Sequence, residues 1–324
     1  EALKVNGTLT QLDVRFNLMS SQLRNELEAA VALNRARSLP DTDTSSVDAS
    51  AMQRVLGTSH FKREYDAGEA PKFQHQLLGA VSDILAQHCM RHGVSTAECT
   101  NFFERLQKEA FRYHDELLTQ IPAAAQRMWT SAHELSDSHK WELCSILNEA
   151  IRMDIPECMP QIAIVARAIN ELCVVRRPKA DLRFPPGGVC WRGGGLPDTH
   201  QPFYMPGKKY RVPGFLATSF SEDKAEEFLF RAYVVNQLPA VKWVVELDPR
   251  GENEFKYRCK HVDLVRRANV PGEEEFLFAP YSVFTVLEVH WACPATDDDP
   301  HVVRLQAAID NRKEPEDLPL APWY

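Results

Sequence analysis

The sequence has no surplus of positive charge and no long apolar run. It carries 37 Lys and Arg against 45 Asp and Glu, a net charge of −8. Binding to nucleic acid or to an anionic membrane surface needs surplus Lys and Arg, so these partners are not predicted, although a local basic site fits. No apolar run approaches the roughly 20 residues that span a bilayer. The chain is 324 residues long and 44% hydrophobic, which predicts a soluble globular protein of one large or two medium domains.

The sequence also lacks any C-x-x-C pair. Its eight cysteines are scattered, and most have apolar neighbours, which favours reduced, buried thiols over a disulfide framework. Reduced cysteines favour a cytoplasmic protein or one delivered into a host cytosol. His88, Cys89, His92 and Cys99 are residues of the types that bind zinc, but their spacing matches no common zinc site, so no metal is predicted. The chain begins at Glu1 without a signal-like segment, as a processed form would, so its N-terminus predicts no location.

The first 180 residues carry helical patterns. Apolar residues at three- and four-residue steps predict an N-terminal helix in residues 1–36 and a helical domain in residues 71–180. Ser, Thr and Asp replace that pattern in between and predict a linker or loop over residues 37–70. Ser95 and Glu98 have the spacing of a capping box. The helical half contains no visible catalytic cluster, and its sequence does not decide between target recognition, coverage of a site and structural support.

Beyond about residue 180, Pro and Gly become frequent and short β-rich runs replace the helical period. The predicted strands are "GVCWRGG", "GFLATSF", "VKWVVEL", "HVDLV", "EEFLF" and "SVFTVLEVHW". Only "SEDKAEEFLFRAYVVNQ" reads as a helix, with Ser221 as its N-cap. The predicted class is therefore α+β, with a catalytic domain in residues 181–293. Residues 294–324 are predicted to form an extended tail on the surface.

Three segments of this half carry residues suited to chemistry. In "VCWRGG", Arg192 ends an apolar strand, where burial is costly without an anionic partner, and its planar fork suits phosphate. Glycines 193–195 would let a ligand approach the backbone. A structural Arg paired with an acid is the alternative. In "GFLATSFS", hydroxyl side chains end a strand beside a helix, a pattern that alone is common.

The third segment, "GEEEFLFAP", places three carboxylates before an apolar strand. Side chains alternate along a strand, so Glu273 and Glu275 are predicted on one face and Glu274 on the other. Two carboxylates at the mouth of a cleft can stabilise an oxocarbenium-like centre and position or deprotonate an acceptor. A solvated acidic turn is the alternative.

In this order, "WRG", "GFLATSFSEDKAEEF" and "EEEFLFAP" resemble the R-S-E class of mono-ADP-ribosyltransferases, which includes clostridial exoenzymes and arginine-specific ecto-enzymes of vertebrates. "YSVFTVLEV" resembles the strand that follows these motifs. The resemblance covers residues 187–290 and implies a core of two small packed β-sheets with a cleft for NAD. It leaves the helical half unexplained.

The resemblance implies a role for each matching residue. Arg192 would contact the phosphate and ribose of NAD, and Gly193 would offer backbone hydrogen bonds to the nicotinamide amide. Gly194 and Thr218 would complete the cofactor site. Phe228 would lie near the nicotinamide ring, with an ordinary core contact as the alternative.

Glu275 would be the catalytic glutamate, hydrogen-bonded to the 2′-hydroxyl of the nicotinamide ribose, and Glu273 would orient the acceptor. One departure affects Glu275: Ala217 stands where the family has the serine that helps to hold this glutamate. Thr218, Ser219 or a water is left to replace that hydroxyl. Ser219 either orients Glu275 or bonds to the backbone.

The resemblance thus implies an enzyme that uses NAD as co-substrate, without a metal, and transfers ADP-ribose to a protein side chain, arginine above all. A glutamate at position 273, rather than glutamine, resembles the members that modify arginine. Two rivals remain from the sequence alone: an NAD glycohydrolase of the same fold, and an interaction module with a degenerate NAD site. The sequence does not predict an oligomeric state.

Overall fold

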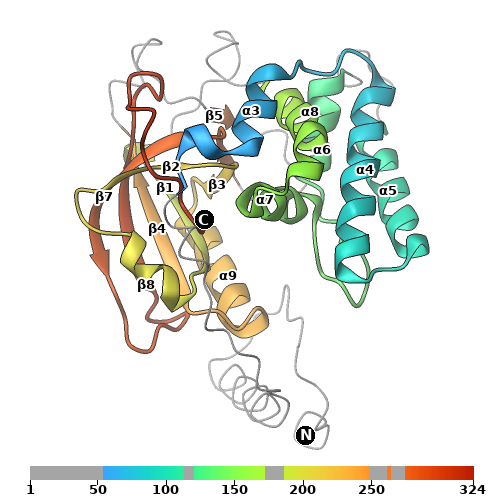
Figure 1. Cartoon of the computed structure of the whole chain (residues 1–324). Helices are drawn as coiled ribbons and strands as arrows, with labels where there is room; N and C mark the ends of the chain where they lie inside the picture. The colour runs from blue at the N-terminus through green and yellow to red at the C-terminus, as the bar shows by residue number, and fades with distance from the viewer. Residues whose placement is uncertain (1–53, 113–119, 172–185, 248–260, 264–273) are drawn as a thin grey trace, which may run out of the picture.

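The computed structural model describes residues 54–112, 120–171, 186–247, 261–263 and 274–324. Helices fill the first part of this range and strands dominate the second, and the two halves lie side by side (Figure 1). The predicted α+β class is confirmed. The helix expected in residues 1–36 lies outside the described residues.

The helical half follows local sequence signals closely. It comprises α3 (His60–Ala67), α4 (Gln74–His92), α5 (Thr96–Ala110), α6 (Ile121–Trp129), α7 (Leu143–Met153) and α8 (Met159–Asn170). Gly93 ends α4 in the left-handed conformation that only glycine adopts without cost. The capping box that opens α5 is present as predicted, with Ser95 Oγ accepting from Glu98 N and Glu98 Oε2 accepting from Ser95 N. No described helix is long and apolar enough to cross a membrane.

Helix α3 corrects the prediction of a loop over residues 37–70. Its first turn has an acceptor far along the chain: Asp154, at the end of α7, accepts from His60 N and Phe61 N, each at 2.9 Å. A carboxylate at a helix N-terminus satisfies orphan N–H groups and interacts well with the helix dipole. The Phe61 side chain is fully buried. The loop was predicted because the residues before position 60 are polar. The short helix that follows them is stabilised by tertiary contacts, which the local sequence does not show.

The second half is a curled sheet with a helix on it. Its strands are β1 (Val189–Gly195), β2 (Lys209–Val212), β3 (Leu216–Ser219), β4 (Ala240–Glu246), β5 (His261–Asp263), β6 (Glu275–Phe278), β7 (Ser282–His290) and β8 (His301–Ala307). Their order across the sheet is β2-β7-β8-β4-β1-β3-β6-β5. Helix α9 (Glu222–Phe230) packs on β1 and β4, and Ser221 is its N-cap as predicted. Short helical turns occur at Leu56–Thr58, Pro156–Cys158, Pro186–Gly188, Asp198–Phe203 and Arg231–Val235.

Strand β8 corrects the prediction of a surface tail over residues 294–324. It lies inside the sheet, parallel to β4 and antiparallel to β7. Val303 and Leu305 are fully buried. The segment alternates apolar and polar residues as a half-buried strand should, but the acidic and proline-rich runs on either side obscured that pattern.

The sheet has two parts that meet at one point. Strands β2, β7, β8, β4 and β1 form one part, and β3, β6 and β5 form the other. Between β1 and β3 a single residue pair is in register, Trp191 with Ser219. The two packed sheets expected from the resemblance are therefore joined through this pair into one curled ladder.

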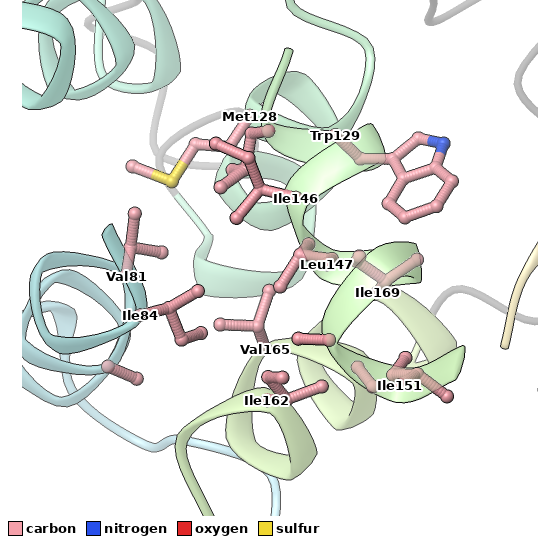
Figure 2. Close-up of a cluster of buried hydrophobic side chains, with 14 of the residues drawn as sticks. Val81, Ile84, Met128, Trp129, Ile146, Leu147, Ile151, Ile162, Val165 and Ile169 are labelled. Atoms are coloured by element: carbon pink, nitrogen blue, oxygen red, sulfur yellow. The ribbon is translucent and has the colours of Figure 1, made fainter. Parts of the chain in front are cut away.

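Two hydrophobic cores lie on the two faces of the strands near this junction. One core fills the helical half, where Val81, Ile84, Ile146, Leu147 and Ile169 pack together (Figure 2). It also takes in side chains from the sheet half, including Phe215 and Leu277. The other core is built from the strands themselves, with Trp243, Phe276 and Phe278 among its members. The helical half thus covers one face of β3 and β6.

Candidate active site

A cavity of about 520 Å³ opens between the helical half and the sheet. Residues of α6, the turn after it and α7 form one wall, and residues of β1, β3, β6 and α9 form the other. This volume lies in the range of small-molecule sites. We call it the central cavity.

Three neighbouring strands align the predicted site residues. Ser219 on β3 pairs with Trp191 of β1 on one side and with Glu275 of β6 on the other. Arg192 follows Trp191 directly. The structure thus brings Arg192, Ser219 and Glu275 together at the wall of the central cavity, although the first and the last are 83 positions apart in the chain.

Glu275 points toward the helical half. Along β6, Phe276 and Phe278 enter the strand core while Leu277 enters the helical core, so alternation places Glu275 on the face of Leu277. Glu275 is almost buried, with 9% of its surface exposed. A buried carboxylate needs hydrogen-bond donors, and the indole Nε1 of Trp129 donates to its Oε1 at 3.1 Å.

The backbone at Glu274 departs from the predicted geometry. Glu274 has φ 45°, in the left-handed region, and β6 begins only at Glu275. Its carbonyl accepts from Phe220 N at 3.1 Å, which ties the entry of β6 to the end of β3. The strand alternation used to place Glu273 beside Glu275 therefore does not run through Glu274. Glu273 itself lies outside the described residues.

Arg192 is half-buried and only partly satisfied. Its Nη1 donates to the Ala217 carbonyl at 3.0 Å, and its guanidinium lies 5.8 Å from the centre of the Trp243 ring. Its Nε is buried without a hydrogen-bond partner. Burial lowers the pKa of Arg192, and Glu275 is among the groups that oppose this shift. Within the described residues Arg192 forms no ion pair, so the structural alternative for this residue is not observed there.

A second arginine faces the central cavity from the helical half. The Cζ of Arg152, on α7, lies 4.5 Å from the centre of the Trp323 ring. The charge of Arg152 adds to burial in lowering the pKa of Arg192. Among the residues that the structure describes, no carboxylate forms an ion pair with Arg152. Sequence reasoning missed it, because an Arg near the end of an amphipathic helix is usually an ordinary solvent-facing cation. Two guanidinium groups without a described carboxylate partner, beside one cavity, favour an anionic ligand.

The glycines after Arg192 have a packing reason that the sequence did not reveal. A Cβ built on Gly193 would lie 1.8 Å from the Ala225 carbonyl oxygen, because α9 crosses β1 there. A Cβ on Gly195 would lie 2.4 Å from the Leu238 side chain. Both positions need glycine for close approach of the protein itself, whereas the prediction attributed that approach to a ligand. Gly194 also lines the cavity.

The hydroxyl residues of β3 make backbone contacts. Thr218 Oγ1 donates to the Phe276 carbonyl at 2.6 Å, and Ser219 Oγ accepts from Ser221 N at 3.0 Å. Ser219 thus bonds to the backbone, and its role in orienting Glu275 stays a prediction. Phe228 on α9 lines the central cavity and is 41% exposed, so it is not the core residue of the alternative interpretation. Its contact with nicotinamide stays a prediction.

The four zinc-type residues considered in the sequence separate into two pairs. His88 and His92 face Glu149 of α7, with His88 Nδ1 at 3.3 Å from one carboxylate oxygen and His92 Nε2 at 3.6 Å from the other. Cys89 instead lies beside Cys99, and burial together with this neighbour raises the pKa of Cys89 to about 12. The ring of Trp141 packs against both histidines.

Comparisons with known proteins give matches among solved structures only. No family model matches the chain, and no curated protein matches it. The structure is similar to the ADP-ribosyltransferase HopU1 of Pseudomonas syringae, at 14% identity and a TM-score of 0.43, over 74% of this chain and 99% of that one. It is also similar to exoenzyme S of Pseudomonas aeruginosa, at 14% identity and a TM-score of 0.37, over 71% and 88%.

A third similar structure is an exoenzyme of Clostridium limosum, at 10% identity and a TM-score of 0.37, over 63% of this chain and 90% of that one. Identities and scores this low do not transfer an activity. A function for this chain has to rest on the residues of its own central cavity.

Proposed function

We propose that the protein is a mono-ADP-ribosyltransferase that moves ADP-ribose from NAD to a protein side chain and releases nicotinamide. One observation carries this proposal. Arg192, Ser219 and Glu275, which the sequence singled out in three separate motifs, lie on consecutive strands at the wall of one cavity. A chance set of motifs would have no reason to converge in this way.

The cavity has the chemistry that a dinucleotide requires. NAD carries an anionic pyrophosphate between two aromatic bases. The unpartnered Nε of Arg192 and the guanidinium of Arg152, which pairs with no described carboxylate, suit the pyrophosphate. Four aromatic residues at the same space are at least partly exposed and can stack on the bases: Trp141, Trp191, Trp323 and Phe228.

Glu275 supplies the charge that the reaction needs. In the proposed step the bond between ribose C1′ and the nicotinamide nitrogen breaks, and its electron pair leaves with nicotinamide. The carboxylate of Glu275 stabilises the positive charge that develops on the ribose and hydrogen-bonds the 2′-hydroxyl. The acceptor nucleophile then forms a bond to C1′ and loses a proton to solvent. In this proposal Glu273 orients the acceptor. Its carboxylate would pair best with a guanidino group, which favours arginine as the acceptor.

The first test is NAD turnover with Glu275→Gln, which keeps the shape of the side chain and removes its charge. We expect turnover to fall at least about a hundredfold, because an electrostatic contact to the transition state is lost. The matched control is Glu288→Gln on the exposed face of β7, which should keep wild-type turnover. A Glu275→Gln protein with full turnover, or a wild type that leaves NAD intact, would refute the proposal.

The acceptor is identified in the same assay. NAD labelled in its adenine part is incubated with cell lysate, and the labelled side chains are found by mass spectrometry. Label on arginine supports the proposed acceptor. Label on another side chain corrects the acceptor while keeping the transferase. Free ADP-ribose as the only labelled product would show that water is the acceptor and that the protein is an NAD glycohydrolase.

A further inference from the structure

The indole of Trp129 joins the helical half to the candidate catalytic carboxylate. Trp129 is the last residue of α6, and its Nε1 donates to Glu275 Oε1 at 3.1 Å. Figure 2 shows its ring at the edge of the helical core, with the nitrogen directed away from the aliphatic side chains. The two residues are 146 positions apart in the chain.

We propose that Trp129 is a positioning residue for Glu275, an inference that rests on the proposed function. The indole N–H is a donor only, and a buried one needs an acceptor, while a buried carboxylate needs donors. This bond meets both needs. By fixing Oε1 it fixes the plane of the carboxylate, and therefore the direction of the other oxygen, Oε2.

The indole is itself held rigidly. Trp129 is 3% exposed, and its ring packs against Phe215 with the centroids 5.0 Å apart. Phe215 directly precedes β3, whose Ser219 is paired with Glu275. The backbone N–H and carbonyl of Phe215 are bonded to the Asn148 side chain, at 3.2 and 3.1 Å. The donor and the strand beside the acceptor are therefore held by the same contacts.

The neutrality of the donor matters for the chemistry. A Lys or Arg at this position would compensate the negative charge that Glu275 must present to a developing cation. An indole N–H orients the carboxylate and leaves that charge in place. Trp129 supplies a side-chain donor from the opposite wall of the cavity.

The primary test replaces Trp129 with benzothienylalanine, in which sulfur stands in place of the N–H at nearly the same shape, beside Trp129→Phe. We expect kcat for NAD to fall about tenfold and KM to stay within about twofold, because orientation of Glu275 is lost and substrate contacts are kept. Trp291→Phe, a tryptophan outside the central cavity that packs on His301, is the matched control and should behave as wild type.

Two further readouts separate positioning from structural support. Loss of a hydrogen bond to the charged form raises the pKa of Glu275, so the acid limb of the pH–rate profile should move up by about half to one pH unit. Adding Ala217→Ser to Trp129→Phe offers a donor on the same strand face and should restore part of kcat. The proposal would be overturned if the benzothienyl protein kept the wild-type kcat and the wild-type acid limb. It would also be overturned if kcat fell only in step with a lower melting temperature and Ala217→Ser did not restore it.

A measurement without turnover keeps this proposal apart from the proposed function. In ¹⁵N spectra the indole resonance of Trp129, assigned through Trp129→Phe, should shift in Glu275→Gln and stay in place in Glu288→Gln. If the wild type does not consume NAD but this shift occurs, the proposed function fails while the bond stands. If NAD is consumed through Glu275 and the resonance does not move, the positioning role is refuted.

Discussion

At the scale of single residues, some side chains of the site could be predicted from the sequence and others could not. Arg192, Ser219 and Glu275 belong to short motifs within strands, and strand alternation brings such motifs to one edge. Trp129 and Arg152 belong to helices with ordinary apolar stripes, and nothing local distinguishes them from core or surface residues. Only the packing of two distant segments gives them a place in the central cavity.

Arg192 gives a residue-scale prediction about affinity. The guanidinium of Arg192 donates to the Ala217 carbonyl through Nη1, while its Nε has no hydrogen-bond partner. The substitution Arg192→Lys keeps the positive charge but removes this planar, multidentate donor. We expect the Kd for NAD, measured by calorimetry, to rise about tenfold or more, as the loss of a charge-assisted hydrogen bond implies. Arg304→Lys on the exposed side of β8 should not change it. Equal affinities of the wild type and Arg192→Lys would show that the fork does not face the ligand.

At the scale of elements, predictions succeeded where the signal was local and failed where it was not. The capping box of α5 and the apolar runs of β1, β3, β6 and β7 were predicted correctly, because each depends on neighbours in sequence. Helix α3 and strand β8 were missed. Asp154 caps the first and neighbouring strands enclose the second, and both contacts come from far along the chain.

The contact between α4 and α7 predicts how stability changes with pH. Burial lowers the pKa of His88 below its ordinary value of 6.5, even though Glu149 opposes this shift and His92 and Arg91 add to it. His88 is therefore neutral in the folded protein at a pH where the unfolded chain binds a proton. The free energy of unfolding should fall as pH drops below 6.5, by at most about 1.4 kcal/mol per pH unit for this proton.

Thermal denaturation between pH 7.5 and 5.5 checks this prediction. His88→Gln should show a shallower fall in melting temperature than the wild type, and exposed His290→Gln should match the wild type. Burial also lowers the pKa of His200 and of His301, which add slopes of the same sign, so the informative quantity is the difference between variants. A steeper fall in His88→Gln would contradict the assignment.

At the scale of the whole molecule, the two halves are built as one body. The helical core takes in Phe215, Leu277, Tyr281 and Leu320 from the sheet half. Sequence patterns indicated a change of character near residue 180, and that position lies outside the described residues. What they could not indicate is that the halves share a core, because apolar residues in strands do not reveal which face meets a helix.

The shared core predicts that the halves unfold together. Calorimetry should give a single transition whose calorimetric and van't Hoff enthalpies agree, and tryptophan fluorescence and far-UV circular dichroism should report the same midpoint. Two separate transitions would show that each half is stable alone. The substitution Leu277→Ala, which opens a cavity in the shared core, should lower the midpoint seen by both probes by the same amount.

The interior place of β8 has a consequence for biosynthesis. Domains form largely in the order in which they leave the ribosome, and every other described strand of this sheet is made before residues 301–307. Until that segment emerges, β4 and β7 each present a bare edge that can pair with another chain. A chain truncated before residue 301 thus holds every predicted site residue and still exposes two edges that can pair with another chain. The seven residues of β8, none of them a predicted site residue, close both edges at once.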